Sequence, residues 1–175
     1  EFPDLPVVAY NVPGRTAVDI APETVARLFH DVENFVGVKE TTKDFEHFSR
    51  VLHLCGPELL VWSGIELLCL PLMALGGAGF VSATANIAPA AVAQMFQAWE
   101  EGYFAKAREI TYGLDTLVDL MFVEIKPVAG KWVLEQRGLI ASSHVRRPPM
   151  NPTHSATPTI TPLNSRRQHW VCCLS

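Results

Sequence analysis

The sequence predicts an α/β fold in which crossover helices connect a parallel sheet. Short apolar runs alternate four times with stretches of helical spacing in the first 101 residues, and this alternation is typical of parallel sheets. With 175 residues, of which 49% are hydrophobic, the chain can bury one core. Two architectures share the pattern: an open doubly wound sheet and a (β/α)₈ barrel. A complete barrel takes about 250 residues, so this chain could hold about half of one.

The first predicted strand covers residues 5–10 and ends in Tyr10, and a turn over residues 11–16 follows it. A helix is expected to begin at Pro22, because proline suits the first helical position and Glu23 places an acid in the first turn. Its apolar stripe consists of Val25, Leu28, Phe29 and Val32.

The second predicted strand is a β-branched, apolar run at residues 35–41, and Lys39 closes it. Asp44 is expected to cap the next helix, which ends at the Gly-Pro pair of residues 56–57. The buried face of this helix is predicted to consist of Phe45, Phe48, Leu52 and Cys55.

Two further strands are predicted at residues 59–64 and 79–84. Between them lies a short apolar helix at residues 66–75, which Pro71 is expected to bend or break. The helix after the fourth strand has an apolar stripe of Val92, Met95, Phe96 and Trp99.

The domain organisation follows from where the strands stop. Residues 1–101 hold the four strand–helix units and are expected to form a half barrel if the barrel architecture applies. Residues 102–150 are predicted to be a helical region, with helices at 103–123 and 126–136. Residues 151–175 are rich in Pro, Thr and Ser without an apolar period, which predicts a disordered tail.

Composition excludes several classes of partner. A formal net charge of −4 gives no sign of nucleic acid or an anionic membrane surface. No residue is charged from 67 to 99, which raises the question of a membrane span. Pro71, the glycine-rich residues 76–79, Asn86 and Pro89 interrupt this stretch, so we predict buried elements and no membrane span.

The cysteines point to a reducing compartment. Cys55 and Cys69 stand singly in apolar surroundings, and Cys172 and Cys173 are adjacent near the end. None has the spacing of a zinc site or of a disulfide framework, so we predict no metal and a cytoplasmic location. We also expect no cofactor.

The chemistry is expected at the carboxyl ends of the strands, where parallel α/β folds collect functional groups. Lys39 would be partly desolvated there, which disfavours the ammonium and makes the free amine available as a nucleophile towards a carbonyl. Tyr10, at the equivalent end of the neighbouring strand, could move protons, and Arg15 could hold a substrate carboxylate. Each residue also has an interpretation without a function. Lys39 could simply reach solvent, Tyr10 could pack under a loop, and Arg15 could be a surface charge.

Four ordered motifs resemble a known family. They are Tyr-Asn-Val-Pro-Gly-Arg-Thr at residues 10–16, Gly-Val-Lys-Glu-Thr at 37–41, Trp-Ser-Gly at 62–64 and Gly-Gly-Ala-Gly-Phe-Val-Ser-Ala-Thr-Ala-Asn at 76–86. In order and spacing they look like the carboxyl-terminal half of the dihydrodipicolinate synthase / N-acetylneuraminate lyase family. This resemblance, which covers about residues 1–150, implies a TIM barrel and a class I, pyruvate-binding aldolase or synthase.

The resemblance also implies roles for individual residues. Lys39 matches the Schiff-base lysine and Tyr10 the proton-relay tyrosine. Arg15 matches the arginine that binds the carboxylate of the second substrate in the family's 4-hydroxy-tetrahydrodipicolinate synthases, which condense pyruvate with aspartate semialdehyde in lysine biosynthesis. Val81 matches a residue whose backbone approaches pyruvate. The predicted substrate-binding residues are Arg15, Val81, Gly64 and Ser63.

Some positions depart from the family pattern. Ile65 follows the Ser-Gly pair where the synthases usually have an acid, which suggests a different aldehyde or a catabolic relative. Residues 124–132 differ from the family's Glu-x-Asn-Pro-x-Pro-x-Lys, whereas residues 145–148 still resemble its Val-Arg-x-Pro.

The family's first four strands have no counterpart in the sequence, which begins without methionine and is expected to be a fragment. The resemblance places in those strands a Gly-Thr-Thr loop for the pyruvate carboxylate, the relay threonine and a second tyrosine. We therefore expect the chain to come from an enzyme that acts on pyruvate and an aldehyde, and to be weak or inactive by itself. We also expect it to assemble as a homo-oligomer or to need the other half of the barrel. The alternatives are a catabolic pyruvate aldolase or hydratase-aldolase, and an inactive half-barrel fragment.

Overall fold

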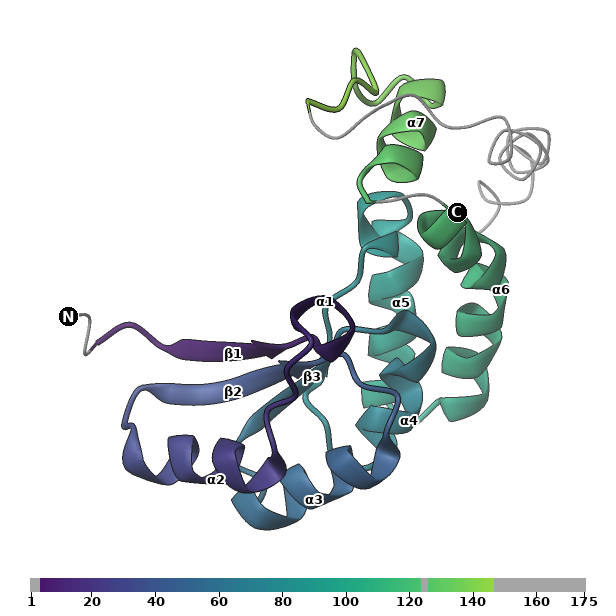
Figure 1. Cartoon of the computed structure of the whole chain (residues 1–175). Helices are drawn as coiled ribbons and strands as arrows, with labels where there is room; N and C mark the ends of the chain where they lie inside the picture. Colours follow the sequence, from purple (N-terminus) through teal and green to yellow (C-terminus); the bar gives the residue numbers. More distant parts are fainter. Residues whose placement is uncertain (1–3, 124–125, 147–175) are drawn as a thin grey trace. The chain divides into compact units, whose positions relative to one another are not determined.

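The computed structural model describes residues 4–123 and 126–146 (Figure 1). Contacts divide the chain into two compact units, Glu1–Ser82 and Ala83–Ser175. The first contains the sheet and its connecting helices, and the second contains the later helices. The boundary that the sequence places at residue 101 falls inside the second unit.

The strands of the first unit form one parallel sheet. Its order is β1-β2-β3-β4, with each strand hydrogen-bonded to the next along the chain. This confirms the predicted parallel α/β class. A doubly wound sheet reverses its strand order at a switch point, and these four strands show no reversal. The strands are β1 (Val7–Asn11), β2 (Phe35–Glu40), β3 (Leu60–Ser63) and β4 (Gly79–Phe80).

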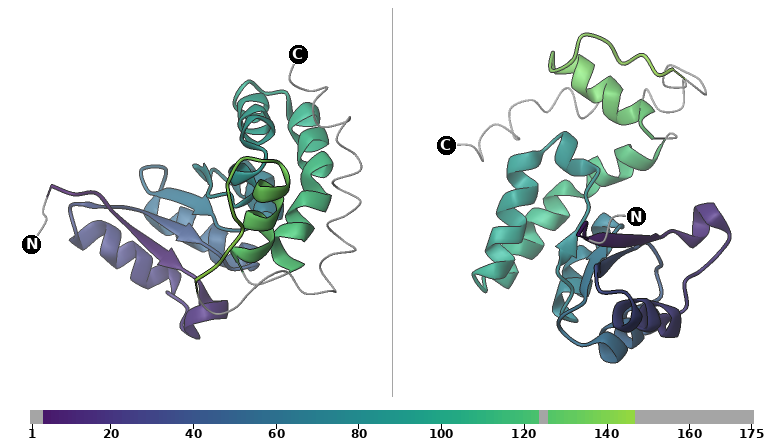
Figure 2. Two further views of the ribbon diagram at one scale, coloured as in Figure 1. Left: turned by 90° about the horizontal axis from the view of Figure 1, so that it is seen from above. Right: turned by 90° about the vertical axis from the view of Figure 1, so that its left-hand side faces the viewer.

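Two helices of the first unit lie side by side against one face of the sheet (Figures 1 and 2). They are α2 (Pro22–Asp31) and α3 (Phe45–Cys55). Pro22 begins α2 as predicted, and the Asp44 carboxylate caps α3 by accepting the N–H groups of Glu46 and His47 at 2.9 and 3.2 Å. The hydrophobic core of this unit consists of Val25, Phe35, Val38, Phe48, Val51, Cys55, Leu59, Val61 and Leu72.

The sequence predictions and the structure differ at several places in this unit. Phe45, predicted on the buried face of α3, is 37% exposed. Val32, predicted in the apolar stripe of α2, lies just beyond the end of that helix and is 39% exposed. The predicted turn over residues 11–16 contains a one-turn helix, α1 (Pro13–Thr16). The predicted helix at 66–75 is η1 (Glu66–Leu68) followed by α4 (Cys69–Ala74). Pro71 lies in the first turn of α4, where a missing N–H costs no intrahelical hydrogen bond. The fourth strand is shorter than predicted, because regular pairing ends at Phe80.

The second unit begins with a short 3₁₀ turn, η2 (Thr84–Asn86). The helices α5 (Pro89–Glu100) and α6 (Phe104–Val123) pack together and confirm the predicted helices there. The last described helix is α7 (Val128–Gln136), and after it Arg137 donates from Nη1 to the Ile87 carbonyl at 2.8 Å. The predicted tail at 151–175 lies outside the described residues.

The uncharged stretch from 67 to 99 is divided among several short elements. In the part of the chain that the structure describes, every helix is too short or too polar to traverse a bilayer.

Candidate functional site

Tyr10 and Lys39 lie together at the carboxyl end of the sheet. They are register partners on β1 and β2, and paired positions of neighbouring strands point to the same face. The Lys39 Nζ atom is 4.0 Å from the centroid of the Tyr10 ring, in a cation–π contact. Tyr10 is 50% exposed and Lys39 is half-buried, so the pair is open to a small molecule. The structure thus brings together the two residues predicted to be catalytic.

Gly64 lies against the stem of the lysine. A Cβ atom added to Gly64 would be 3.1 Å from Lys39 Cε, 2.1 Å from Thr41 Cγ2 and 3.3 Å from the Glu40 carbonyl oxygen. Its N–H donates to that carbonyl at 2.7 Å, which brings the β3 turn close to the end of β2. Only glycine allows this approach without displacing a neighbour.

Ser63 and Val81 contribute to the same edge through different atoms. The buried Ser63 hydroxyl donates to the Ile65 carbonyl at 2.8 Å and accepts the Ile65 N–H at 3.1 Å, so it stabilises the turn that contains Gly64. The Val81 N–H donates to the Ser63 carbonyl at 2.8 Å, one residue beyond the last regular pair of β3 with β4. Their substrate-binding roles stay predictions.

Arg15 lies in α1, just beyond the end of β1, and its side chain is exposed. The described residues include no acid within salt-bridge distance of its guanidinium. An exposed arginine at the carboxyl edge of the sheet is available to a carboxylate, as the sequence predicts, and this role also stays a prediction.

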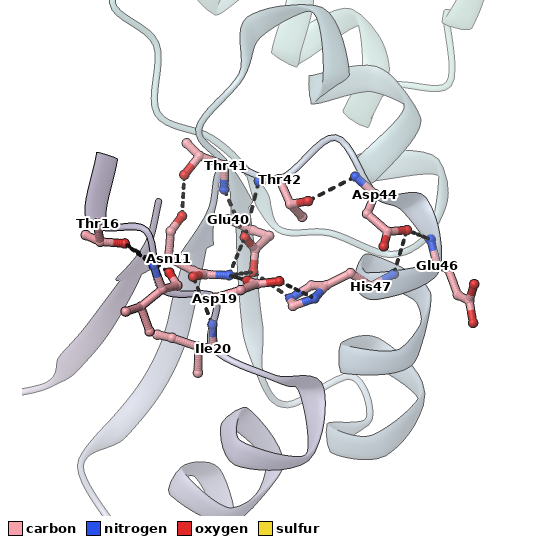
Figure 3. A network of polar contacts seen from close by, with 11 residues as sticks. Asn11, Thr16, Asp19, Ile20, Glu40, Thr41, Thr42, Asp44, Glu46 and His47 are labelled. Carbon is pink, nitrogen blue, oxygen red and sulfur yellow. Dashed lines mark hydrogen bonds and ion pairs between the residues drawn. The ribbon is translucent and has the colours of Figure 1, made fainter. Parts of the chain in front are cut away.

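β2 continues one residue beyond the lysine, so Glu40 and not Lys39 ends the strand. Glu40 is 1% exposed and forms a polar network with Asn11 and His47 on the helix-covered face (Figure 3). Burial raises the pKa of the Glu40 carboxyl, although the Asn11 hydrogen bond and the charge of His47 oppose the shift. Sequence reasoning missed this network, yet strand alternation places Glu40 opposite Lys39 and could have found it.

The raised pKa predicts how Glu40 affects stability. A folded state with a raised carboxyl pKa binds its proton more tightly than the unfolded chain does, so lowering the pH favours folding. Glu40 should add to the unfolding free energy below its ordinary pKa of 4.5, and this gain should be lost as the pH rises through the raised value. Urea unfolding of the native chain and of Glu40→Gln should therefore show a free-energy difference that grows in favour of the native chain on acidification.

A matched control for this measurement is Glu46→Gln, because Glu46 is a glutamate that is 73% exposed on α3. Its pH dependence should parallel that of the native chain. A native-minus-Glu40→Gln difference that shrinks on acidification would contradict the prediction.

The fold and the site define a parallel α/β protein with an amine and a phenol paired at the carboxyl edge of its sheet. The chain belongs to the dihydrodipicolinate synthetase family, whose model matches residues 1–163. The resemblance stated from the motifs is confirmed.

Individual relatives agree with this assignment. The chain is 45% identical over 136 residues to the 4-hydroxy-tetrahydrodipicolinate synthase of Thermodesulfovibrio yellowstonii, covering 78% of this chain and 46% of that protein. The synthase structure from Methylacidiphilum fumariolicum SolV matches with a TM-score of 0.89 and 30% identity, over 96% of this chain and 56% of that one. The chloride-inhibited dihydrodipicolinate synthase of Acinetobacter baumannii, solved with pyruvate, matches with a TM-score of 0.83 and 31% identity, over 91% and 54%. This chain spans about half the length of the relatives it matches.

Proposed function

We propose that this chain provides the Schiff-base lysine and the proton-relay tyrosine of a lyase or synthase that acts on pyruvate and an aldehyde. The observation that carries the proposal is the Lys39 amine, 4.0 Å from the Tyr10 ring centroid at the carboxyl edge of a parallel sheet. Imine formation from a ketone takes an amine as nucleophile and a neighbouring group that transfers protons, and a phenol can serve as the second.

The chemistry follows from these two groups. The free Lys39 amine adds to the ketone carbon of pyruvate and forms a carbon–nitrogen bond. The former carbonyl oxygen takes up protons and leaves as water, and we assign to the Tyr10 hydroxyl the role of carrying protons to and from it. Loss of a methyl proton from the resulting imine gives an enamine, whose carbon attacks the aldehyde.

The remaining predicted residues are assigned to substrate binding. Arg15 holds the carboxylate of the second substrate, for which aspartate semialdehyde is proposed from the similarity to the synthases. Gly64, positioned by the Ser63 turn, keeps the space beside the Lys39 stem open, and the Val81 backbone lines the same edge.

The four strand–helix units are proposed to form the carboxyl-terminal half of a (β/α)₈ barrel. The unreversed strand order and the share of each relative that is matched support this. We expect the 175-residue polypeptide by itself to be weak or inactive, and to need the complementary half or to assemble with further copies. The cytoplasmic location predicted from the cysteines stays a prediction.

A second candidate function is a catabolic pyruvate aldolase or hydratase-aldolase of the same family. The observation that favours it is Ile65, an apolar residue directly after Gly64 where the synthases usually have an acid. The same lysine and tyrosine would then act on another aldehyde. A comparison of aldehydes in the condensation assay, with aspartate semialdehyde as reference, distinguishes the two.

The experiment that tests the proposal is borohydride trapping. The chain is incubated with pyruvate, reduced and analysed by intact mass and peptide mapping, with a full-length relative treated in parallel. An adduct on the Lys39 peptide is expected if the described unit presents the lysine. Labelling of the relative with no adduct on this chain would mean that the site requires residues beyond these 175, and an adduct on another lysine would refute the assignment of Lys39.

Tyr10→Phe is expected to slow adduct formation by about 10²- to 10⁴-fold, the range for loss of a general acid–base group. Phenylalanine keeps the ring face against the Lys39 amine and removes only the hydroxyl. The rate of borohydride-trapped adduct formation provides the measurement. Tyr112→Phe is the matched control, because Tyr112 is 71% exposed on α6. Equal rates for the two variants would remove Tyr10 from the proton relay.

A further inference from the structure

A buried carboxylate lies one residue beyond Lys39, on the opposite face of β2. Glu40 and its register partner Asn11 are each only 1% exposed. Asn11 follows Tyr10 on β1 just as Glu40 follows Lys39 on β2. Whatever fixes Asn11 and Glu40 therefore also fixes the backbone positions of the Tyr10–Lys39 pair.

The Glu40 carboxylate accepts hydrogen bonds from three segments of the chain (Figure 3). From β1, Asn11 Nδ2 lies 2.9 and 3.1 Å from the two carboxylate oxygens. From the loop after β2, the N–H groups of Thr41 and Thr42 donate to Oε1 at 3.0 and 3.3 Å. From α3, His47 Nε2 lies 3.0 Å from Oε2. Displacement of the carboxylate would break all of these hydrogen bonds at once, which is costly in a buried network.

Asn11 also takes part in several hydrogen bonds besides those to Glu40. Its side-chain amide also donates to Asp19 Oδ1 at 2.6 Å, and its side-chain oxygen accepts the Ile20 N–H at 3.2 Å. Its carbonyl accepts the Thr41 N–H at 3.0 Å, and the Thr41 hydroxyl donates to the same oxygen. The end of β1 is thereby tied both to β2 and to the segment before α2.

The ionisable neighbours of Glu40 come from α3 and from the segment between α1 and α2. His47 lies between two acids, with Nε2 on Glu40 and Nδ1 at 3.8 Å from Asp19 Oδ2. Asp44 holds the first turn of α3, which contains His47, by accepting its N–H. The hydrogen bonds around Glu40 thus connect β1, β2 and α3 on the face of the sheet opposite the paired amine and phenol.

We propose that Glu40 is a positioning residue for the Tyr10–Lys39 pair: its carboxylate joins the ends of β1, β2 and α3 so that the lysine amine stays against the tyrosine ring. Its side chain lies on the helix-covered face, so it acts through the strand ends and does not touch substrate. The inference rests on the proposed function, in which this amine attacks a ketone.

The test uses the whole chain and a series of variants of decreasing severity. Glu40→Ala removes the carboxylate that all of these donors share. Glu40→Gln keeps the volume but offers a single acceptor oxygen. His47→Gln alters the contact from α3 to Glu40 and the contact of the same ring with Asp19. The matched controls are Glu46→Gln and His53→Gln, because both residues are exposed on α3.

The measurement is the rate and the final amount of borohydride-trapped pyruvate adduct on Lys39, together with the folded fraction by circular dichroism. For Glu40→Gln we expect at least about a tenfold slower rate at saturating pyruvate, since small misplacements of reacting groups carry penalties up to about a hundredfold. The final labelled amount should match that of the native chain, because a positioning defect slows every molecule. His47→Gln should be slowed less, and the two controls should label at the native rate.

A merely structural role would give a different result. Partial unfolding would lower the labelled amount in proportion to the folded fraction and leave the rate of the folded molecules unchanged. That result, or a native rate in folded Glu40→Gln, would overturn the proposal.

A second readout separates this inference from the proposed function. Limited acetylation with acetic anhydride, followed by peptide mass analysis, compares the reactivity of Lys39 with that of the exposed Lys43 and requires no pyruvate. In Glu40→Gln the half-buried Lys39 should become more reactive relative to Lys43. If the native chain gives no pyruvate adduct but this ratio changes, the chain alone does not carry out the imine chemistry of the proposed function, and the positioning role still stands. An unchanged ratio in the folded variant overturns the positioning role.

Discussion

Lys39→Arg is expected to abolish the pyruvate adduct while leaving the fold intact. Arginine keeps the positive charge, a similar length and the contact with the Tyr10 ring face, but its guanidinium does not provide a neutral amine for attack on a ketone. The variant therefore separates the chemistry of the amine from its charge. Intact mass after borohydride reduction gives the yield, and circular dichroism confirms that the variant is folded.

Lys43→Arg is the control for this variant. Lys43 is exposed four residues further along the chain, so its replacement should leave the adduct yield unchanged. A Lys39→Arg chain that still gains the pyruvyl mass would show that another amine is labelled, and the proposed role of Lys39 would be withdrawn.

Gly64→Ala is expected to damage both stability and adduct formation. The new methyl group would lie 2.1 Å from Thr41 Cγ2 and 3.1 Å from Lys39 Cε, so both side chains must move. Thr41 cannot rotate freely, because its hydroxyl donates to the Asn11 carbonyl. Overpacking of this kind costs about 1–3 kcal/mol of unfolding free energy. Urea unfolding measures that loss, and borohydride trapping measures displacement of the lysine.

Two further variants show whether the effect of Gly64→Ala arises from the clash. Thr41→Ser removes the Cγ2 methyl but keeps the hydroxyl, so the double variant Gly64→Ala/Thr41→Ser should recover most of the stability. It should recover less of the adduct, because the contact with Lys39 persists. Gly113→Ala adds a methyl that meets nothing within 4 Å in α6, and it should be neutral or stabilising by up to about 1 kcal/mol. If Gly64→Ala resembles Gly113→Ala, the close packing around Lys39 is not required.

The sequence pattern identified the class of fold because burial leaves a strong periodic signal. The apolar run at β2 and the capped, amphipathic α3 were predicted close to their observed bounds. Shorter elements were harder to predict, because two to four residues carry too little periodicity. α1 therefore appeared as a turn, and β4 was predicted to be longer than its two paired residues.

The candidate site was predictable where a residue's role follows from its place at a strand end. Tyr10 and Lys39 were placed together by the rule that parallel strands share a carboxyl edge, and the structure pairs them in register. Glu40 was overlooked because an acid after a lysine at a strand end looks like a second exposed charge. Its burial depends on which face of β2 the helices cover.

By itself, the sequence determined the parallel α/β class, the helix caps and the strand ends that carry the amine and the phenol, because backbone periodicity and capping are local properties. Only the tertiary structure decided that Gly64 packs against the lysine stem and that Glu40 collects donors from three segments. The His47 and Asn11 contacts join Glu40 to residues 7 and 29 positions away, and no local rule specifies such partners. They depend on strand register and on helix packing, which are properties of the whole unit.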